Sequence, residues 1–576
     1  MHYNLFKSSN RKYLEEIKHR GHEMPILYDA VNILQKTEWL VNEPVYKVFK
    51  HCLDNNIPLG KLPVNPESIE LPPKPADIAT NKDALIKWKK LAKPIHYQKV
   101  KLQSKFIQVH QIKAIVERYR KLNKGFFFPQ QYDFRGRLYP KPAMFEPQSA
   151  DYARALMKFK FGKKMGTNEN FEKFAIYGAN LFGEVDKEPI EVRLKWVTEN
   201  SDRIIATATD PINDHYWDKA DKAFAFLAWA IEYKAFAESE FDADFITTLP
   251  IQADCSNSGL QHYSAMMRDE VGGKATNLIP SNKPQDVYNE VAENVIEKLE
   301  RYKREPRLPE KKKDKVIEYN DVLFATQWLD YGINRKTVKK PVMCLPYSLT
   351  RFSCRKYLEE HVLKEEQDRG AYNPFKEDLF KATQYLMPIV WQSIGEVIVG
   401  AKNVMKFLQE VSRLVSSENL PVCWTTPNNY PVQMWNYETE SKRVKTRMGD
   451  SVIKLTLLTN TDRISKRDTS QAVAPNFIHS LDSACLQLAV VKARAAGIEN
   501  FCMIHDSFGV LAPDYDVMAV AVREAFCEIY EKDVLANWAK EMHDMLSEKN
   551  QRKFPKLPPK GRLDLALVKK SIFFCI

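Results

Sequence analysis

Apolar residues recur at helical spacing through much of the first 125 positions. In residues 24–53, MPILYDAVNILQKTEWLVNEPVYKVFKHCL, they fall three and four positions apart, which predicts amphipathic helices. The proline-rich segment 62–79 cannot form regular helix, because proline lacks the amide hydrogen. Residues 83–122 again predict helix, rich in lysine and arginine. These cations form either an ordinary solvated face or, with Trp88 and Tyr97, a track for a phosphate backbone.

Short strand-like runs stand among helical segments from residue 126 onward. Residues 245–256, FITTLPIQADCS, predict a strand that ends in a turn. Residues 500–512, NFCMIHDSFGVLA, predict two strands joined at His505 and Asp506. Other segments predict long helices (285–305 and 324–343) and an exposed lysine-rich loop (305–316).

Composition narrows the class of protein. The chain has 576 residues, too many for one hydrophobic core, and its 44% hydrophobic and 11% aromatic content is typical of globular proteins. The net charge of +12 favours a polyanionic partner, nucleic acid before membrane, although an ordinary basic surface would give the same total. No signal peptide is evident, and the longest apolar run, residues 223–231, is too short to span a bilayer. We therefore expect a soluble protein of three or four domains or subdomains.

The nine cysteines are scattered along the chain without a C-x-x-C pair. This spacing argues against a zinc site and against a disulfide framework. We expect reduced cysteines, as in a cytosolic protein.

Two aspartates each close a strand-like run, Asp254 after LPIQA and Asp506 after CMIH. A buried charge costs several kcal/mol unless another group compensates for it. If the fold brings them together, two carboxylates on adjacent strands can hold a pair of Mg²⁺ ions about 3.5–4 Å apart for phosphoryl transfer. Either aspartate alone would more often cap a turn.

The segment 331–352 contains Arg335, Lys339, Met343 and Tyr347 at intervals of four, so they share one helix face. Two cations suit the phosphates of a nucleoside triphosphate, and the thioether and phenol suit its base and sugar. A helix face with arginine and lysine is also often simply solvated. Pro346 would end or kink the helix, which would place Tyr347 at a movable junction.

These segments together resemble the single-subunit RNA polymerases of bacteriophages and mitochondria, and the phage branch more closely. DCSNSGLQHYSAMMRDEVGG (254–273) and IHDSFG (504–509) resemble the two catalytic motifs of the family, and RKTVKKPVMCLPYS (335–348) its nucleotide-binding helix. YDFRGRLYP (132–140) matches the D-x-R-G-R element, and VAPNFIHSLDSACL (473–486) the histidine-containing segment. The motifs occur in the family's order, and the resemblance runs from about residue 25 to the carboxyl end.

The resemblance implies an α+β, mostly helical right-hand fold, with thumb, palm and fingers around a small antiparallel palm sheet. It divides the chain into a remnant of the N-terminal or connector region (1–37), the thumb (38–125), the first part of the palm (126–282), the fingers (283–479), and the second part of the palm with the C-terminal tail (480–576). Residues 445–468 take the place of the promoter-specificity hairpin, and their basic, alternating pattern suits a β-hairpin in a DNA groove.

The family's catalytic residues transfer to matching positions. Asp254 and Asp506 would bind the two Mg²⁺ ions, and the backbone carbonyl of Cys255 would contribute a further ligand. His505, beside Asp506, would position the primer end, unless it is simply a satisfied histidine of the palm.

The resemblance assigns a further set of residues to the nucleotide and the polynucleotides. Lys339 and Arg335 would grip the triphosphate, and Lys339 would protonate the departing pyrophosphate. Tyr347 and His479 would sense the ribose 2′-hydroxyl. The remaining residues would contact the nucleotide (Met343 and Tyr288) and the template strand or RNA–DNA hybrid (Arg135 and Arg137).

The implied activity is that of a DNA-directed RNA polymerase, which uses a DNA template and NTPs to extend an RNA product. One alternative is a DNA polymerase of the related right-hand family, whose first motif resembles D-Y-S-Q-I-E and carries a glutamate that blocks a 2′-hydroxyl. Gly259 stands at that position and cannot block a hydroxyl, which favours ribonucleotides. Another alternative is a non-catalytic nucleic-acid-binding subunit, which the intact Asp254, Lys339, Tyr347 and Asp506 disfavour.

The chain departs from the family at three places. Ser348 replaces the usual glycine after Tyr347, and Pro341 falls within the presumed helix. The chain begins shortly before the thumb region, so we expect the family's promoter-binding N-terminal domain to be truncated or supplied by a separate polypeptide. A protein partner would then be needed for promoter recognition. The resemblance implies the cytoplasm of an infected bacterial host.

Overall fold

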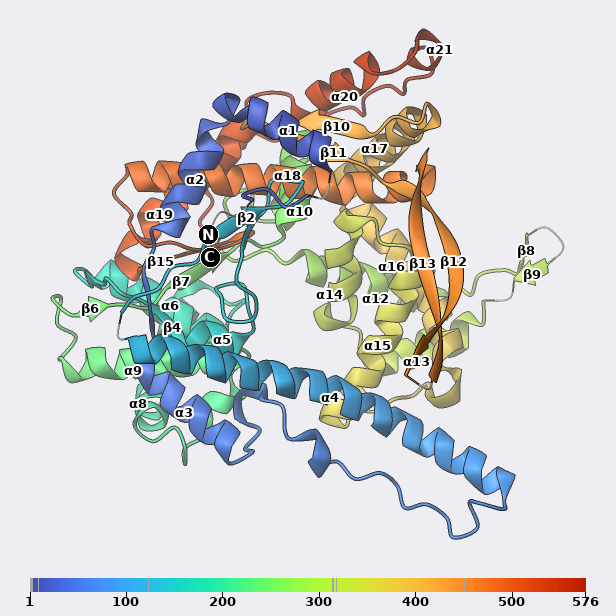
Figure 1. Cartoon of the computed structure of the whole chain (residues 1–576). Helices are drawn as coiled ribbons and strands as arrows, with labels where there is room; N and C mark the ends of the chain where they lie inside the picture. Colours follow the sequence, from blue (N-terminus) through green and yellow to red (C-terminus); the bar gives the residue numbers. More distant parts are fainter. Residues whose placement is uncertain are drawn as a thin grey trace.

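The computed structural model describes residues 4–8, 10–122, 124–312, 315–317, 319–449 and 451–575. The chain is mostly helical, with small antiparallel sheets of two or three strands, as the sequence led us to expect (Figure 1). In the part that the structure describes, no helix is both long enough and apolar enough to cross a membrane.

The N-terminal segment folds into three short helices, α1 (Arg11–His19), α2 (Pro25–Gln35) and α3 (Glu43–Asp54), which confirms the expected periodicity. The side chain of Asn10 caps α1, and Pro25 starts α2 at the first helical position, where the missing amide hydrogen costs nothing. Between the helices, β1 (Trp39–Val41) pairs with β4 (Met157–Phe159). Three residues are too few to give a periodic pattern, so this strand was not predicted.

The basic segment forms one helix of 41 residues, α4 (Lys82–Leu122), which includes Pro94. Its C-terminal half is anchored by the buried residues Val109, Ile112 and Val116. Towards its N-terminal end, the indole of Trp88 donates to the Pro72 carbonyl at 2.9 Å, so the proline-rich connector packs beside the helix. In Figure 1, α4 runs along the lower side of the molecule and extends beyond its body.

A first aromatic-rich core lies between α3, the anchored end of α4 and the helices that follow. The helices of this core are α5 (Asp151–Ala155), α6 (Asn168–Phe182), α7 (Ile190–Glu199), α8 (Ser201–Thr209) and α9 (Ala223–Glu238), and the short strands β5 (Lys163–Lys164) and β6 (Ile246–Thr247) lie in the same part of the chain. The hairpin β2 (Gln130–Tyr132) and β3 (Leu138–Pro140) instead contributes Tyr132 and Leu138 to a second core. Trp217, Phe224 and Trp229 are fully buried at its centre.

A second and larger core joins α1 and α2 to most of the chain from residue 253 onward. Its helices are α10 (Ser258–Met267), α11 (Glu270–Ala275), α12 (Val287–Arg304), α13 (Asp321–Tyr331), α14 (Arg335–Cys344), α15 (Arg351–Arg369), α16 (Leu379–Val397), α17 (Val399–Ser417), α18 (Lys466–Ala495), α19 (Tyr515–Ile529), α20 (Val534–Asp544) and α21 (Glu548–Gln551). The hairpin β10 (Val422–Thr425) and β11 (Pro431–Met434) packs against it.

The two cores meet at a three-stranded antiparallel sheet in the order β14 (Cys502–Ile504), β15 (Ser507–Val510), β7 (Ile251–Asp254). Ile251 belongs to the first core, whereas Phe508 and Val510 belong to the second. The predicted strand before Asp254 and the predicted hairpin at residues 505–506 are both confirmed.

Two predicted elements differ from the structure. The helical segment 324–343 is broken into α13 and α14, because Gly332 takes a left-handed conformation (φ 83°) and ends α13. The lysine-rich segment was expected to be a loop, but β8 (Glu310–Lys312) and β9 (Lys315–Ile317) pair as a short hairpin. Its lysines and glutamate gave no alternating apolar pattern from which strands could be recognised.

The expected hairpin near residues 445–468 is present as a two-stranded ribbon, β12 (Tyr437–Met448) and β13 (Ser451–Ile464). It begins eight residues earlier than expected, and residues 466–468 instead open α18. Most of the described ribbon residues are exposed, including Leu455 and Leu458.

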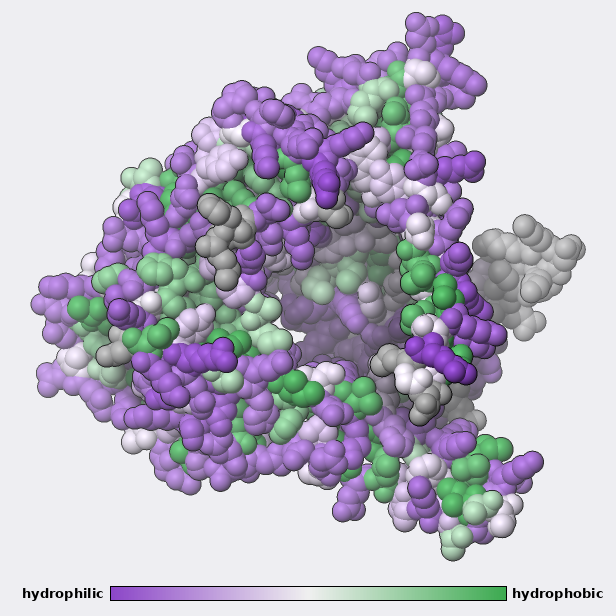
Figure 2. All heavy atoms as spheres, in the orientation of Figure 1, coloured by the Kyte–Doolittle hydropathy of each residue, from purple (hydrophilic) through white to green (hydrophobic). Residues whose placement is uncertain are grey.

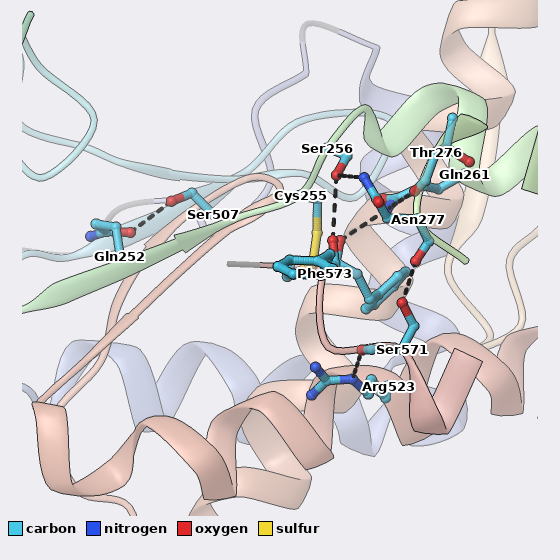
Figure 3. The surroundings of a disulfide bond; sticks show 12 residues. Gln252, Cys255, Ser256, Gln261, Thr276, Asn277, Ser507, Arg523, Ser571 and Phe573 are labelled. Atoms are coloured by element: carbon cyan, nitrogen blue, oxygen red, sulfur yellow. Dashed lines mark hydrogen bonds between the residues drawn. A yellow bond between two sulfur atoms is a disulfide. The ribbon is translucent and has the colours of Figure 1, made fainter. Parts of the chain in front are cut away.

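The expectation of reduced cysteines is wrong for one pair, because Cys255 and Cys575 form a disulfide (Figure 3). The other cysteines are free. Hydrogen bonds also hold the C-terminal tail: the Gln261 amide donates to the Phe574 carbonyl at 3.0 Å, and the Ser571 hydroxyl to the Asn277 carbonyl at 2.6 Å. The two cysteines are 320 residues apart, so sequence spacing gave no sign of the bond.

The molecule has a broad hollow that opens towards the viewer in Figure 2. Hydrophilic residues dominate its visible walls. In Figure 1, α4 borders this region below, α18 above, and α14 with α12 on the right.

Candidate active site

The fold brings the two predicted metal-binding aspartates together at one end of the central sheet. Asp254 is the last residue of β7, and Asp506 lies in the turn between β14 and β15. Ser507, next to Asp506, is directly opposite Asp254 in the antiparallel register. The Cys255 amide donates to the Asp506 carbonyl at 3.2 Å, so the backbone also joins the two motifs.

Asp506 has a pKa of about 6, well above its ordinary value. Burial is the main cause, and the neighbouring carboxylates Asp482 and Asp254 raise the pKa further. Asp254 is exposed, and its carboxylate lies 3.5 Å from the ammonium of Lys222, a residue that the sequence did not single out.

This pair of carboxylates suits a hard divalent cation. The described residues contain no group of three or more histidine, cysteine, aspartate or glutamate side chains that could hold a metal ion. The side-chain ligands that the protein offers at this place are therefore the two carboxylates. Carboxylate oxygens are the ligands that Mg²⁺ prefers, and it commonly uses one or two of them together with substrate phosphates. Burial, and then the charges of Asp482 and Asp254, raise the pKa of Asp506, and a bound cation would favour its ionised form.

Cys255, whose carbonyl was predicted to face the metal, is tied to the C-terminal tail. It forms an isolated antiparallel bridge with Cys575 in addition to the disulfide. Figure 3 shows this tail against the chain that follows β7. The last residues of the protein therefore brace the segment next to Asp254.

His505 occupies the turn beside Asp506 in a left-handed conformation (φ 52°). Holding a non-glycine residue in the left-handed conformation costs about 1–3 kcal/mol of free energy. Residues strained in this way are common at functional sites. Its ring packs edge-on against Tyr139 at 5.0 Å. Burial and the nearby Arg137 and Arg135 lower the pKa of His505 to about 3, so the ring is neutral at physiological pH.

Helix α14 begins with a capping box, in which Asn334 and Thr337 satisfy each other's backbone amides. Nε of Arg335 donates to the Asp286 carboxylate at 2.5 Å, which holds the guanidinium 5.5 Å from the centre of the Tyr288 ring. Lys339 follows one turn later; its side chain is exposed overall, yet partial desolvation of the ammonium and the neighbouring Arg335 lower its pKa.

The other end of α14 is a junction, as its prolines predicted. Pro341 lies within the helix and Met343 is exposed on its surface. The helix gives way to a short 3₁₀ turn (Leu345–Tyr347), and Ser348 then adopts a left-handed conformation (φ 61°). The family's usual glycine would take this conformation without strain.

Tyr347 lies beside His479, its expected partner in sensing the ribose 2′-hydroxyl, and close to Gly259. Its ring lies 4.7 Å from the ring of His479 on α18. A Cβ atom at Gly259 would approach the Tyr347 hydroxyl to 3.3 Å and Pro346 Cβ to 3.1 Å, so a larger residue would crowd this place. The hydroxyl of Tyr288 nearby accepts a hydrogen bond from Asn257 at 3.3 Å.

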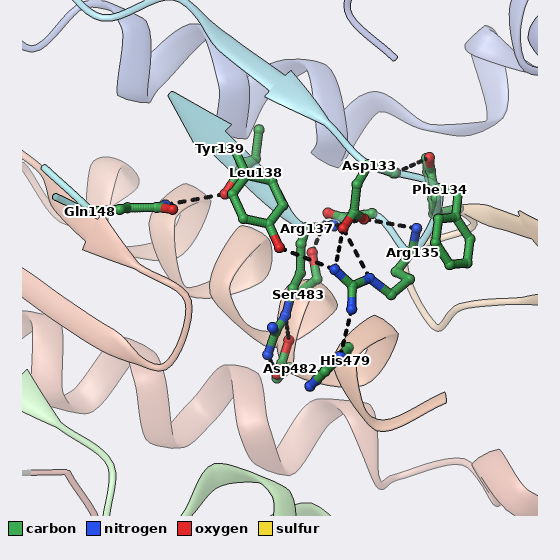
Figure 4. A network of polar contacts seen from close by, with 12 residues as sticks. Asp133, Phe134, Arg135, Arg137, Leu138, Tyr139, Gln148, His479, Asp482 and Ser483 are labelled. Atoms are coloured by element: carbon green, nitrogen blue, oxygen red, sulfur yellow. Dashed lines mark hydrogen bonds and ion pairs between the residues drawn. The ribbon is translucent and has the colours of Figure 1, made fainter. Parts of the chain in front are cut away.

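The D-x-R-G-R segment forms the tight turn between β2 and β3 (Figure 4). Asp133 accepts hydrogen bonds from the backbone amides of Arg135 and Arg137, and its carboxylate pairs with the Arg135 guanidinium. Gly136 takes a left-handed conformation (φ 87°) and packs against Tyr430.

The turn is docked on one face of α18. Arg137 forms a buried ion pair with Asp482, and Ser483 and Gln487 both donate to the Gly136 carbonyl. The pKa of Asp482 is raised because burial outweighs the attraction of Arg137. Arg135 and Arg137, which were predicted to contact nucleic acid, are therefore both paired with protein carboxylates.

Three polar residues of this network escaped the sequence prediction: Asp482, Tyr139 and Lys222. Asp482 lies three positions after His479 in a helical segment, so a search along that helix face would have found it. Lys222 and Tyr139 are brought to the site by tertiary contacts alone. The structure brings the aspartates, Tyr347, His479 and the D-x-R-G-R turn into one region.

Comparison with known proteins identifies the family of the chain. A profile described as DNA-dependent RNA polymerase matches residues 163–553. The chain is 35% identical to the DNA-directed RNA polymerase of Enterobacteria phage T3 over 96% of its own length and 64% of the relative's. For T7 RNA polymerase of Escherichia phage T7 the identity is 33% over 99% and 66%, respectively.

An organellar relative is somewhat more distant. DNA-directed RNA polymerase 1, mitochondrial, from Arabidopsis thaliana is 31% identical over 95% of this chain and 54% of its own length. The chain thus spans less than two thirds of the length of each of these relatives. The profile match, which covers more than half of the chain, and the similarity to the phage enzymes establish that the chain belongs to the DNA-dependent RNA polymerase family.

Proposed function

We propose that the chain is a DNA-directed RNA polymerase that transfers nucleoside monophosphates from NTPs to an RNA 3′ end and releases pyrophosphate. The observation that carries this proposal is the approach of Asp254 and Asp506 at one end of the antiparallel sheet, where Ser507, next to Asp506, is opposite Asp254. Two carboxylates in this arrangement suit phosphoryl transfer.

Asp254 and Asp506 would hold two Mg²⁺ ions, which when bound stabilise the attacking and leaving oxygens. Asp506 must lose its proton to take part. Since its pKa is about 6, the carboxylate is mainly ionised above neutral pH. The strands that flank Asp506 are buried where the two cores meet, which holds the carboxylate in place.

Arg335 and Lys339 would bind the triphosphate from one face of α14. Asp286 fixes the Arg335 guanidinium, so the group is oriented before the nucleotide arrives. The lowered pKa of Lys339 makes its ammonium a stronger acid, which favours proton transfer to the departing pyrophosphate. Met343, exposed one turn later, is available to the base.

Tyr347, His479 and Gly259 would select ribonucleotides. Gly259 leaves space beside the Tyr347 hydroxyl, and His479 supplies a hydrogen-bonding group next to it. A site built to bond a hydroxyl rejects a substrate that lacks it. These contacts favour RNA synthesis over the DNA polymerase alternative.

A cavity of about 670 Å³ beside the α14 junction suits a polynucleotide. It is lined by Ser348, the aromatic Trp391 and five cationic residues: Lys402, Lys406, Arg413, Lys466 and Arg467. Cations attract phosphates, and an aromatic face can stack on a base. We infer that the template strand passes here, and that the exposed β12–β13 ribbon contacts duplex DNA.

The arrangement of elements supports the proposed right-hand organisation. The long α4 would form the thumb within residues 38–125, and the central sheet the palm within residues 126–282 and 480–576. Helices α12 to α17 would form the fingers within residues 283–479, on the opposite side of the hollow from the sheet (Figure 1).

Extension of an RNA primer on a preformed RNA–DNA scaffold tests the proposal. With Mg²⁺ and NTPs the wild type should extend the primer, with dNTPs it should do so poorly, and Asp506→Asn should lose extension by at least about 10³-fold. Asp516→Asn, at a side chain that is 66% exposed and paired with Lys173, is the matched control and should keep wild-type activity. Equal rates for Asp506→Asn and the wild type would refute the catalytic assignment, and scaffold binding without any extension would favour a non-catalytic subunit.

A further inference from the structure

His479 receives a hydrogen bond from an arginine. Nη1 of Arg135 lies 2.8 Å from Nδ1 of the His479 ring (Figure 4). A guanidinium has five N–H donors and no acceptor, so the ring nitrogen that faces it must accept. That nitrogen therefore carries no proton.

The position of Arg135 is itself fixed by three further hydrogen bonds. Its Nε and Nη2 donate to the Asp133 carboxylate at 2.9 and 2.6 Å, and Nη2 also donates to the Tyr139 hydroxyl at 3.1 Å. The Asp133 carboxylate is held in turn by the backbone amides of the turn. With these bonds made, the guanidinium directs Nη1 at His479, and few of its donors are left for a phosphate.

An accepting Nδ1 determines the chemistry of the opposite side of the ring. A neutral imidazole carries one proton, so the proton resides on Nε2. Burial and the cations Arg137 and Arg135 lower the pKa of His479 to about 2, so the ring does not become doubly protonated near neutral pH. Among the described residues no protein group accepts from Nε2, and the ring lies 4.7 Å from Tyr347, beside the space left by Gly259.

We propose that Arg135 is a positioning residue for sugar selection: by donating to Nδ1 of His479 it fixes the tautomer and orientation of the ring, so that Nε2–H donates to the oxygen of the ribose 2′-hydroxyl. This inference rests on the proposed function and deepens it. It replaces the expected contact between Arg135 and the template strand with a contact inside the protein. A deoxyribonucleotide offers no acceptor at this place and leaves the Nε2–H donor unpaired.

The tautomer can be observed without catalysis. Protein labelled with ¹⁵N-histidine, studied by long-range ¹H–¹⁵N correlation spectra and assigned with His479→Gln, reports which ring nitrogen carries the proton. We expect Nε2–H alone for His479 in the wild type. Arg135→Met removes the donor at similar length and should yield a mixture of tautomers, whereas Arg135→Lys keeps a donor and should restore the wild-type spectrum.

Competition between NTPs and dNTPs on the RNA–DNA scaffold gives the second readout. Loss of the fixed donor in Arg135→Met should reduce ribose selectivity about tenfold, the effect of one hydrogen bond of about 1.4 kcal/mol. In Arg135→Met the rate of extension with NTPs should fall by a smaller factor than the ribose selectivity. Arg135→Lys should recover most of the selectivity. Arg203→Met, at an exposed arginine of α8, is the control for loss of a cation and should leave selectivity unchanged.

Two results would overturn the proposal: protonated Nδ1 in the wild-type ring, or wild-type selectivity in Arg135→Met. Both are distinct from failure of the proposed function, which would appear as absence of extension by the wild type. In that case the spectra still decide whether Arg135 sets the tautomer.

Discussion

Asp506 is a residue at which function and stability oppose each other. Its carboxylate is buried next to Asp482 and Asp254, and its pKa of about 6 compares with an ordinary value of 3.8. Without a cation, ionising this group costs folding free energy. The site is therefore organised for a metal-bound state.

We expect Asp506→Asn to raise the free energy of unfolding in EDTA. Because the folded pKa is above the ordinary value, the protonated carboxyl favours folding below about pH 4, and this contribution is lost as the pH rises through 6. The difference in free energy of unfolding between Asp506→Asn and the wild type should thus grow with pH, to about 3 kcal/mol in favour of the variant at pH 7. Urea unfolding between pH 5 and 7.5 measures it, with Asp516→Asn as the control; a difference independent of pH would contradict the explanation.

Ser348 is a second residue under strain. Its φ of 61° is left-handed, and its hydroxyl is buried without a hydrogen-bond partner among the described residues. Both features cost free energy, and glycine would remove both.

We therefore expect Ser348→Gly to stabilise the protein by about 1 kcal/mol, measured from the midpoint of urea unfolding. The matched control is Ser353→Gly in the first turn of α15, where glycine should destabilise by up to about 1 kcal/mol. If both variants lowered the midpoint, Ser348 would not be the strained position. A change in the NTP concentration at half-maximal extension would link this junction to nucleotide binding.

At the scale of elements, the β12–β13 ribbon is the clearest separable part. Its register pairs Glu440 with Thr459, so an Asn-Gly turn joining these two residues would shorten the ribbon and keep the pairing of the remainder. The cut removes five cations: Lys442, Arg443, Lys445, Arg447 and Lys454.

The shortened ribbon should leave extension on an RNA–DNA scaffold unchanged, because the described residues of the ribbon are mostly exposed and none of them forms a hydrogen bond with the central sheet. Affinity for duplex DNA should fall, and its salt dependence should become shallower because fewer phosphates are neutralised. Binding to labelled duplex at several salt concentrations tests both. Unchanged affinity with an unchanged slope would remove the ribbon from the proposed DNA contact.

Elements with a long or distinctive pattern were predictable from sequence. Helix α4 and the turn at His505 and Asp506 followed from periodicity and from turn residues. Strand β1 was not predictable in this way, because its partner β4 lies more than a hundred residues away along the chain. Each of the two strands has only three residues. The same holds at the site: Asp254 and Asp506 carried a motif, whereas the ion pair between Arg137 and Asp482 depends on how a turn docks on a helix.

At the scale of the whole molecule, the C-terminal tail closes the structure around the central sheet. The disulfide between Cys255 and Cys575 joins the end of β7 to the end of the chain, across 320 residues. A crosslink over so long a loop restricts the unfolded chain strongly.

Cys575→Ser should lower the free energy of unfolding by about 2–5 kcal/mol. It should also slow extension, because the tail would no longer brace Cys255 beside Asp254. Dithiothreitol should have the same effect on the wild type and no further effect on the variant, which distinguishes the bond from simple repacking. Cys423→Ser, at a free cysteine, is the control; equal sensitivity of Cys575→Ser and the wild type to dithiothreitol would contradict the prediction.

The anchoring of α4 at one end has a mechanical consequence. From Val109, where the helix is held in the first core, to its start at Lys82 is about 40 Å at 1.5 Å per residue. A tilt of about 10° at the anchor would move the far end by about 7 Å. The helix would thus act as a lever, because a small rearrangement of the side chains around Ile112 would displace its far end while the sheet and its aspartates keep their positions.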